Sequence, residues 1–306
     1  MMRCFLVLMW LLATSVACGD RTATYPEDVD SSADPTAIVP EVVSFPSFEL
    51  IGEIDHIFQH PESIVYDGAT QMLYVSNLGL DTGTIEDRDG YISKLNIHGE
   101  IIDARWVEGL SNPRGMCIVG GVLYVADMDK IAKVDLESGE VIASVSTPGL
   151  KMLSDLAVGA NGKIYATDQQ ANRIYELAAD ELQLWNENLN WFGPSGLYSH
   201  GGKLLLTSAE GNRLMAVDLH TKETYQIADS LHQARGITMI GADMLVGGMS
   251  GQLYGVKPTI DFRWPLIDLE MQRDNVAGIL YVEEFDVLFV PTYSGHSVLA
   301  IAVMQP

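Results

Sequence analysis

The chain has 306 residues, 47% of them hydrophobic, and carries 41 acidic against 18 basic side chains, which gives a formal net charge of −23. A surface this acidic repels nucleic acid and anionic lipid headgroups, so neither is expected as a partner. After the N-terminal segment, no stretch of eighteen apolar residues occurs that could span a bilayer as a helix.

The first 17 residues are typical of an export signal. Arg3 gives a positive start, an apolar run follows over residues 5–12, and small residues lead to Cys18. The segment SVACG around Cys18 resembles the bacterial lipobox, in which the cysteine is acylated and becomes the mature N-terminus. This resemblance implies export and a lipid anchor on Cys18, on the periplasmic side of a bacterial membrane or at the cell surface. Ordinary secretory cleavage nearby is the alternative.

Residues 18–47 are rich in Asp, Glu, Pro, Ser and Thr and show no sustained period of 2 or 3.6. This composition predicts a flexible acidic tether between the lipidated cysteine and a folded domain over residues 48–306. With residues 1–17 removed, Cys117 is the one cysteine of that domain, so no disulfide can form within it. Its apolar neighbours predict a buried thiol.

A strand–turn–strand pattern occurs six times in the folded part, as in NPRGMCIVGGVLYVAD and LSDLAVGANGKIYATD. The turns are mostly residue pairs that accept positive φ, such as Gly120-Gly121. Four short strands per period of about forty residues is the spacing of a β-propeller, and no segment between the strands has helical periodicity. The predicted fold is therefore all-β with six blades, and five or seven blades would require a misplaced boundary. The equivalent first-strand positions recur at Gly115, Asp155, Gly196, Gly236 and Gly278.

The ends of the repeat predict how the ring closes. The sixth unit runs out at Pro306 after three strands, whereas FELIGEI at residues 48–54 is a strand without a hairpin partner. We expect this N-terminal strand to pair into the last blade, because that satisfies its backbone groups and removes an exposed edge. Between the first and second units, Gly79 to Asp89 inserts an extra loop at the rim.

In a propeller with alternating strands, the start of each first strand and the end of each second strand lie on one face, at the mouth of the central channel. Two arginines among carboxylates and hydroxyls at these positions predict a small polar ligand with an anionic group. In the alternative interpretation, Arg114 and Arg235 pair with Asp127 or Asp168 and join the blades. The predicted ligand-binding residues are Glu62, Asn77, Arg114, Asp127, Ser154, Asp168, Ser195, Arg235 and Tyr293.

Three further groups of residues near this face are metal-binding or catalytic candidates: the acidic residues of the inserted loop, two histidines and the serines. Glu86, Asp87 and Asp89 in the inserted loop are similar to half of a calcium loop, and a solvated acidic loop is the alternative. His60 is the one histidine expected near the rim, whereas His296 is expected in a surface turn. No serine has a histidine and an acid at suitable positions, so a serine triad is not expected, and no residue is assigned a catalytic role.

The hairpin repeats, and HPESIVYD at residues 60–67 in particular, resemble the senescence-marker-protein, gluconolactonase and luciferin-regenerating-enzyme family. The resemblance implies a six-bladed propeller with a divalent cation (Ca²⁺, Mg²⁺, Mn²⁺ or Zn²⁺) at the central mouth. Its ligands would be a glutamate of the first blade, an asparagine of the fourth and an aspartate of the fifth, with an asparagine of the third at the substrate. Glu62 matches the first ligand. The fourth-blade position carries Ser195, the fifth-blade position carries Arg235, and the third-blade position carries Ser154 with Asp155 beside it. The fixed positive charge of Arg235 repels a cation.

These observations favour a membrane-tethered, extracytoplasmic propeller that binds a small polar ligand, anionic or sugar-derived, at its mouth. The resemblance and Glu62 imply a second hypothesis, a hydrolase that acts on lactones or related esters with a divalent metal. Its metal would need oxygen ligands such as Glu62, Asn77, Asp127 and Asp168. A third hypothesis is a scaffold that assembles protein partners at the membrane.

Overall fold

The computed structural model describes residues 46–80, 88–257, 262–268 and 275–304. The chain divides into two units, residues 1–43 and 44–306, and every described residue belongs to the second. The predicted export signal, Cys18 and most of the tether therefore lie outside the described residues, as do Glu86 and Asp87 of the inserted loop. Within the described ranges there is no helix long and apolar enough to cross a membrane.

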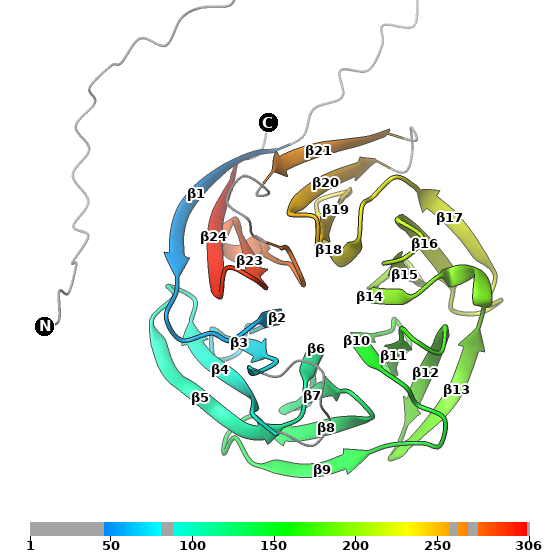
Figure 1. Cartoon of the computed structure of the whole chain (residues 1–306), viewed down its shortest axis with the longest axis horizontal. Helices are drawn as coiled ribbons and strands as arrows, with labels where there is room; N and C mark the ends of the chain where they lie inside the picture. The colour runs from blue at the N-terminus through cyan, green and yellow to red at the C-terminus, as the bar shows by residue number, and fades with distance from the viewer. Residues whose placement is uncertain (1–45, 81–87, 258–261, 269–274, 305–306) are drawn as a thin grey trace, which may run out of the picture. The chain divides into compact units, whose positions relative to one another are not determined.

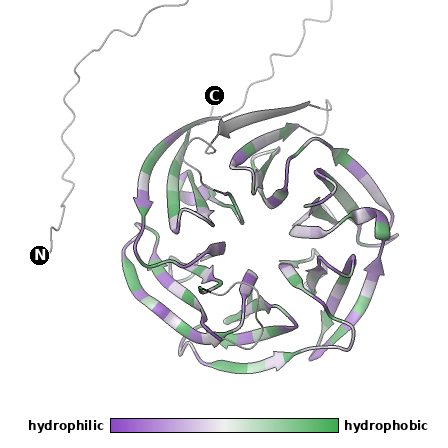
Figure 2. Ribbon diagram, in the orientation of Figure 1, coloured by the Kyte–Doolittle hydropathy of each residue, from purple (hydrophilic) through white to green (hydrophobic). Residues whose placement is uncertain are grey.

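The described residues form six four-stranded antiparallel sheets arranged in a ring, with one strand of each sheet next to the axis (Figure 1). Consecutive residues of strands such as β3, β11 and β15 are buried, so both faces of a sheet can pack against neighbouring sheets. Figure 2 shows hydrophobic and hydrophilic residues along the same strands. The predicted all-β, six-bladed propeller is thereby confirmed.

The first three blades follow the chain from the inner strand outward. Blade 1 contains β2 (Pro61–Asp67), β3 (Met72–Asn77), β4 (Gly90–Asn96) and β5 (Ile101–Leu110). Blade 2 contains β6 (Pro113–Val119), β7 (Val122–Asp127), β8 (Lys130–Asp135) and β9 (Val141–Val145). Blade 3 contains β10 (Leu153–Val158), β11 (Ile164–Asp168), β12 (Arg173–Ala178) and β13 (Glu181–Glu187).

The other three blades have the same inner-to-outer order, except that the last takes its outer strand from the N-terminal side. Blade 4 contains β14 (Pro194–His200), β15 (Lys203–Ser208), β16 (Arg213–Asp218) and β17 (Thr224–Ala228). Blade 5 contains β18 (Ala234–Ile240), β19 (Asp243–Gly248), β20 (Gln252–Lys257) and β21 (Phe262–Asp268). Blade 6 contains β22 (Leu280–Val282), β23 (Val287–Thr292), β24 (Ser297–Met304) and β1 (Ser47–Ile54).

The ring closes where β1 pairs with β24, and Figure 1 shows the two strands side by side. The pairing is antiparallel and runs from Ser47 opposite Met304 to Ile54 opposite Val298. A bulge between Leu50 and Gly52 shifts the register by one residue. The predicted closure by an N-terminal strand is confirmed, and this strand begins one residue earlier than predicted.

Six buried apolar clusters hold the blades together, and each draws its side chains from two neighbouring blades. Cys117 of blade 2, for example, packs in the cluster shared with blade 3. It is buried, as predicted, and burial raises the pKa of its thiol. Tight hairpins such as Gly120-Gly121, both at positive φ, connect the strands.

The recurring glycines of the inner strands let these strands approach one another around the axis. The amide of Gly278 donates to the carbonyl of Glu62 at 2.7 Å, and the amide of Gly236 donates to the carbonyl of Ala277 at 3.0 Å. A Cβ atom on Gly196 would lie 1.8 Å from the carbonyl oxygen of Arg235. The repeated glycine is therefore a packing requirement that narrows the channel. We call the six equivalent positions the inner frame: Ser63, Gly115, Asp155, Gly196, Gly236 and Gly278.

Candidate functional site

Three charged side chains from three blades meet at the start of the inner strands. Glu62 Oε1 accepts from Arg114 Nη1 and from Arg235 Nη1, each at 3.4 Å. The side chains of Glu62 and Arg114 are only 9% and 10% exposed, and that of Arg235 is 19% exposed. Blades 1, 2 and 5 thus place one carboxylate between two guanidinium groups at the mouth of the channel. The alternative pairing of the arginines with Asp127 or Asp168 is not found among the described ion pairs.

Neutral polar groups complete this cluster on the side of blades 3 and 4. Arg235 Nη1 also donates to Ser195 Oγ at 3.2 Å and to Gln169 Oε1 at 3.4 Å. Ser195 Oγ lies 3.4 Å from Ser154 Oγ. Of the sequence-predicted site residues, the structure therefore brings Glu62, Arg114, Ser154, Ser195 and Arg235 together. Their contact with a ligand stays a prediction.

The predicted residues at the ends of the second strands hold the loops of the mouth. Asp127 Oδ1 accepts from the backbone amides of Ser111 and Asn112, each at 2.8 Å. Asp168 accepts in the same way from three backbone amides, those of Lys151, Met152 and Ala171, and Asn77 accepts from that of Gln59. Asn77, Asp127 and Asp168 are fully buried, so these side chains fix the loops that lead into the inner strands.

Two histidines and a tyrosine form a second group at the rim, where blade 6 meets blade 1. His60 Nδ1 lies 2.8 Å from the carbonyl oxygen of Gly79, which can only accept, so this nitrogen carries the proton and Nε2 is the basic one. The ring of His60 packs against Tyr293 at 4.8 Å and against His296 at 4.6 Å between centroids. The backbone amide of His60 also donates to His296 Nδ1 at 3.1 Å.

His296 is exposed and lies in a turn at positive φ, as its sequence position predicted. Its contact with His60, 236 residues away, was missed, because only ring closure brings the last hairpin beside the first blade. Partial burial, and secondarily the charge of His60, lower the pKa of His296. The neutral imidazole is therefore favoured there.

A divalent cation does not fit this mouth. Among residues 46–80, 88–257, 262–268 and 275–304, no group of three or more His, Cys, Asp and Glu side chains could hold a metal ion. Glu62 lies between two fixed positive charges, which repel a cation, and Asn77, Asp127 and Asp168 are engaged with backbone amides. The residues present thus favour an anion over a metal ion.

Near Arg235, Asp155 takes the place that glycine has in most blades of the inner frame. Its Oδ2 accepts from the amide of Leu197 in blade 4 at 2.7 Å, and its Oδ1 accepts from the amide of Leu156 at 2.8 Å. The missing Cβ of Gly115 leaves the space, since a Cβ there would lie 2.0 Å from Asp155 Oδ1. A void of about 20 Å³ remains between Asp155 and Glu62.

Burial is the largest effect on the pKa of the Asp155 carboxyl and raises it to about 7. The charge of Glu62 also raises this pKa, whereas the two backbone hydrogen bonds and the charge of Arg235 lower it. From the ordinary pKa near 4 up to about 7, the folded state holds a proton that the unfolded state has lost, so stability decreases as pH rises through this window.

We expect the free energy of unfolding to fall by about 2 kcal/mol more in the wild type than in Asp155→Asn between pH 5 and pH 7. Urea denaturation at several pH values measures this difference. Parallel curves for the two proteins would show that Asp155 does not titrate in this window.

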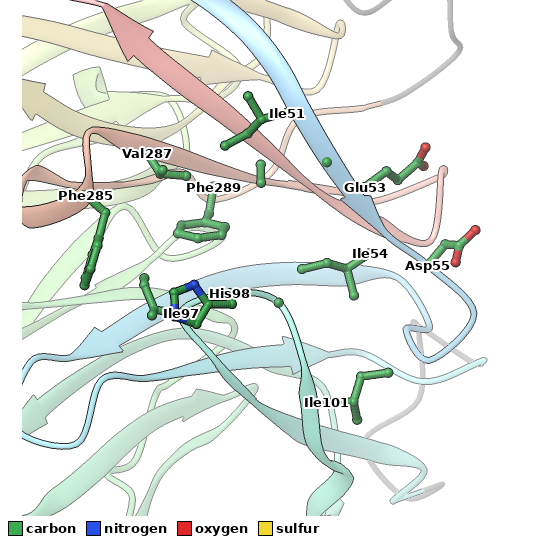
Figure 3. A pocket seen from close by; sticks show the side chains of 13 residues that line it. Ile51, Glu53, Ile54, Asp55, Ile97, His98, Ile101, Phe285, Val287 and Phe289 are labelled. Atoms are coloured by element: carbon green, nitrogen blue, oxygen red, sulfur yellow. The ribbon is translucent and has the colours of Figure 1, made fainter. Parts of the chain in front are cut away.

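A larger cavity, about 650 Å³, lies away from the mouth in the groove between blades 6 and 1 (Figure 3). Its walls are mainly apolar and include Ile54, Ile97, Phe285 and Phe289. Ile51, the residue inside the β1 bulge, also lines it. This groove shares no residue with the Glu62 cluster, so it is a feature of the ring closure.

Solved structures share this fold. The chain matches the virginiamycin B lyase of Staphylococcus aureus with a TM-score of 0.59 and 14% identity, over 84% of this chain and 100% of that chain. A streptogramin B lyase structure matches with the same TM-score and identity, over 84% and 98%. A histidine-to-alanine variant of the S. aureus lyase, described as catalytically inactive and crystallised with quinupristin, matches with a TM-score of 0.59 and 15% identity, over 84% and 100%.

No protein-family model and no curated protein matches the sequence. At 14–15% identity, the likeness to the solved structures concerns the fold. The chain is a six-bladed β-propeller, and its fold is similar to that of virginiamycin B lyase.

Proposed function

We propose that the mouth of this propeller binds a small anionic ligand, such as a carboxylated or sugar-derived acid, through Arg114 and Arg235. The observation that carries the proposal is a surplus of buried cationic donors. Two guanidinium groups supply ten N–H bonds between them, yet they share one carboxylate oxygen at the rather long distance of 3.4 Å.

Arg114 shows this surplus most clearly. The residue is 8% exposed, and its Nε is buried without a hydrogen-bond partner. An unsatisfied buried donor on a charged group costs about 1–3 kcal/mol or more, so a ligand oxygen at this place would recover that free energy. Two arginines beside one carboxylate also give the cluster a net positive charge, in a chain whose formal net charge is −23. The local charge therefore favours an anion.

Calorimetric titration with gluconate, citrate and inorganic phosphate tests the proposal. We expect at least one of these anions to bind and Arg114→Gln to weaken its binding about 10–100-fold, because hydrogen bonds to a charged group contribute about 1.5–3 kcal/mol. Arg173→Gln is the control, since Arg173 pairs with Glu187 on the partly exposed side of blade 3. The proposal fails if none of the anions binds, or if Arg114→Gln binds as tightly as the wild type.

Catalysis at the same mouth is the second candidate, and the orientation of His60 favours it. A histidine whose Nδ1 donates to a carbonyl presents Nε2 as a base. The lyases that share the fold, one of which is described as catalytically inactive when a histidine is replaced, are a precedent for histidine-dependent chemistry on a propeller. A panel of lactones tested with wild type, His60→Gln and His200→Gln would support this candidate if only His60→Gln loses turnover. Turnover that follows added metal and is indifferent to His60→Gln would favour the metal-dependent hydrolase instead.

The proposed setting is extracytoplasmic, with the domain attached to a membrane by a lipid on Cys18. Its support is the sequence of residues 1–19 and the acidic segment that follows. Mass spectrometry of the N-terminal peptide can detect the lipid on Cys18. We expect this lipid to be absent in Cys18→Ser, and the test is independent of ligand binding.

A further inference from the structure

We propose that the end of the central channel opposite the mouth is a second binding site, which takes a small ammonium compound with an apolar group and uses Asp155 as its counter-ion. The proposal concerns a different cavity from the arginine cluster and does not rest on the proposed function.

The site is a cavity of about 260 Å³, on the far side of the inner frame from Glu62. Each inner strand starts at the mouth, and the cavity is lined by residues that come later in these strands, such as Val65 in blade 1 and Thr238 in blade 5. A volume of this size equals that of about nine water molecules, which suits a ligand of modest size. None of Glu62, Arg114 and Arg235 lines it.

The inner frame lies between this cavity and the mouth, and four of its residues, Ser63, Asp155, Gly236 and Gly278, border both sides; Asp155 is the charged one among them. Asp155 lines both the small void below the arginines and the far cavity. Each of its oxygens accepts one backbone amide, which leaves further lone pairs free to accept from a ligand. A ligand in the far cavity can therefore reach the carboxylate without entering through the mouth.

The lining of the far cavity selects a cation with an apolar body. Among the described residues that line it, Asp155 is the one charged residue, and none is Lys, Arg or His. The walls are mostly aliphatic, and Tyr198 adds an aromatic ring, whose face attracts ammonium groups. Burial raises the pKa of the Tyr198 phenol, so this ring stays neutral. An alkyl- or arylammonium ion matches these walls and this charge.

The charge of Asp155 makes binding depend on pH. The groups that act on it are Glu62, Arg235 and the thiol of Cys117, and burial raises its pKa to about 7. Only the ionised carboxylate attracts the ammonium group. We expect affinity to fall about 30-fold between pH 8 and pH 5.5, because the ionised fraction falls by that factor.

Calorimetric titration of the full-length protein with benzylammonium tests the inference, with benzyl alcohol as the neutral analogue. We expect saturable binding of benzylammonium at pH 8, the 30-fold loss at pH 5.5, no comparable binding of benzyl alcohol, and at least a 10-fold loss in Asp155→Asn. Ser199→Trp, at a half-buried lining position, should weaken binding without touching Asp155. His200→Trp is its control, because the neighbouring His200 is exposed and does not line the cavity.

The inference is overturned if benzylammonium does not saturate at pH 8, or if benzyl alcohol binds as tightly. Equal affinity at the two pH values, or in Ser199→Trp and His200→Trp, would also overturn it. The neutral analogue, the pH comparison and Ser199→Trp decide the question even if Asp155→Asn does not fold.

Discussion

Glu62→Gln is expected to lower the free energy of unfolding at neutral pH by about 3–5 kcal/mol, the usual effect of removing one partner from a buried ion pair. The neutral amide would leave Arg114 and Arg235 buried without a counter-ion. Since both guanidinium groups contact the same carboxylate oxygen, the substitution also leaves two like charges close together.

The size of this effect depends on whether Glu62 is ionised in the folded protein. Burial raises its pKa, and the charges of Arg114 and Arg235 lower it. At 3.4 Å and an effective dielectric constant of about 20, each attraction contributes about 5 kcal/mol. Burial remains the largest effect and holds the pKa of Glu62 above its ordinary value, but these attractions limit the rise, so we expect an ionised Glu62 at pH 7.

Urea denaturation of Glu62→Gln beside Glu187→Gln measures the effect. Glu187 is the exposed partner of Arg173, and its replacement should change stability by less than about 1 kcal/mol. Sulfate should raise the melting temperature of Glu62→Gln more than that of the wild type, because an external anion then replaces the missing charge. Unchanged stability of Glu62→Gln would mean that Glu62 is neutral in the folded state, contrary to our expectation.

Gly196→Ala is expected to destabilise the ring by about 3 kcal/mol or more, above the usual range for overpacking. The added Cβ would lie 1.8 Å from the carbonyl oxygen of Arg235, which belongs to the backbone of the next blade. Backbone cannot rotate away as a side chain can, so blades 4 and 5 must move apart. The same displacement would shift Arg235 away from Glu62 and weaken anion binding.

Thermal unfolding of Gly196→Ala, with Gly68→Ala as the matched control, tests this prediction. Gly68 also lacks a positive φ. A Cβ atom added to Gly68 would lie 3.6 Å from its nearest neighbour, a side-chain atom of Tyr66, which is an ordinary contact distance. We expect the control to stay within about 0.5 kcal/mol of the wild type. Equal stability of the two variants would show that the inner strands can separate without loss.

Most of the fold could be predicted from local signals in the sequence. Strand alternation and turn pairs such as Gly120-Gly121 act over a few residues, and their period of about forty residues indicates the propeller. The strand at residues 48–54 had no hairpin partner, and the last unit lacked one strand. The pairing of these two segments, which closes the ring, could therefore be predicted as well. The bulge that places Ile51 at the groove between blades 6 and 1 left no such signal.

The site was less predictable, because residue type and position do not show what a side chain contacts. The repeat placed Glu62, Arg114 and Arg235 at equivalent positions, and they do meet. Asp127 and Asp168 also stand at strand ends that face the mouth. Their carboxylates, however, accept hydrogen bonds from backbone amides and so hold loops, as many buried carboxylates do. Asp155 could have been noticed as the acid among the glycines of the inner frame, whereas the contact of His296 with His60 depends on ring closure.

The pairing of β1 with β24 also determines when the molecule can finish folding. About 250 residues separate the two strands, so at a synthesis rate of about 5–20 residues per second β1 is made roughly 10–50 seconds before its partner. During that interval its backbone is an open edge that could pair with another chain. Glu49 and Glu53, both exposed on this strand, put negative charges on that edge. The negative charges on β1 thus oppose its pairing with another chain until β24 has been synthesised.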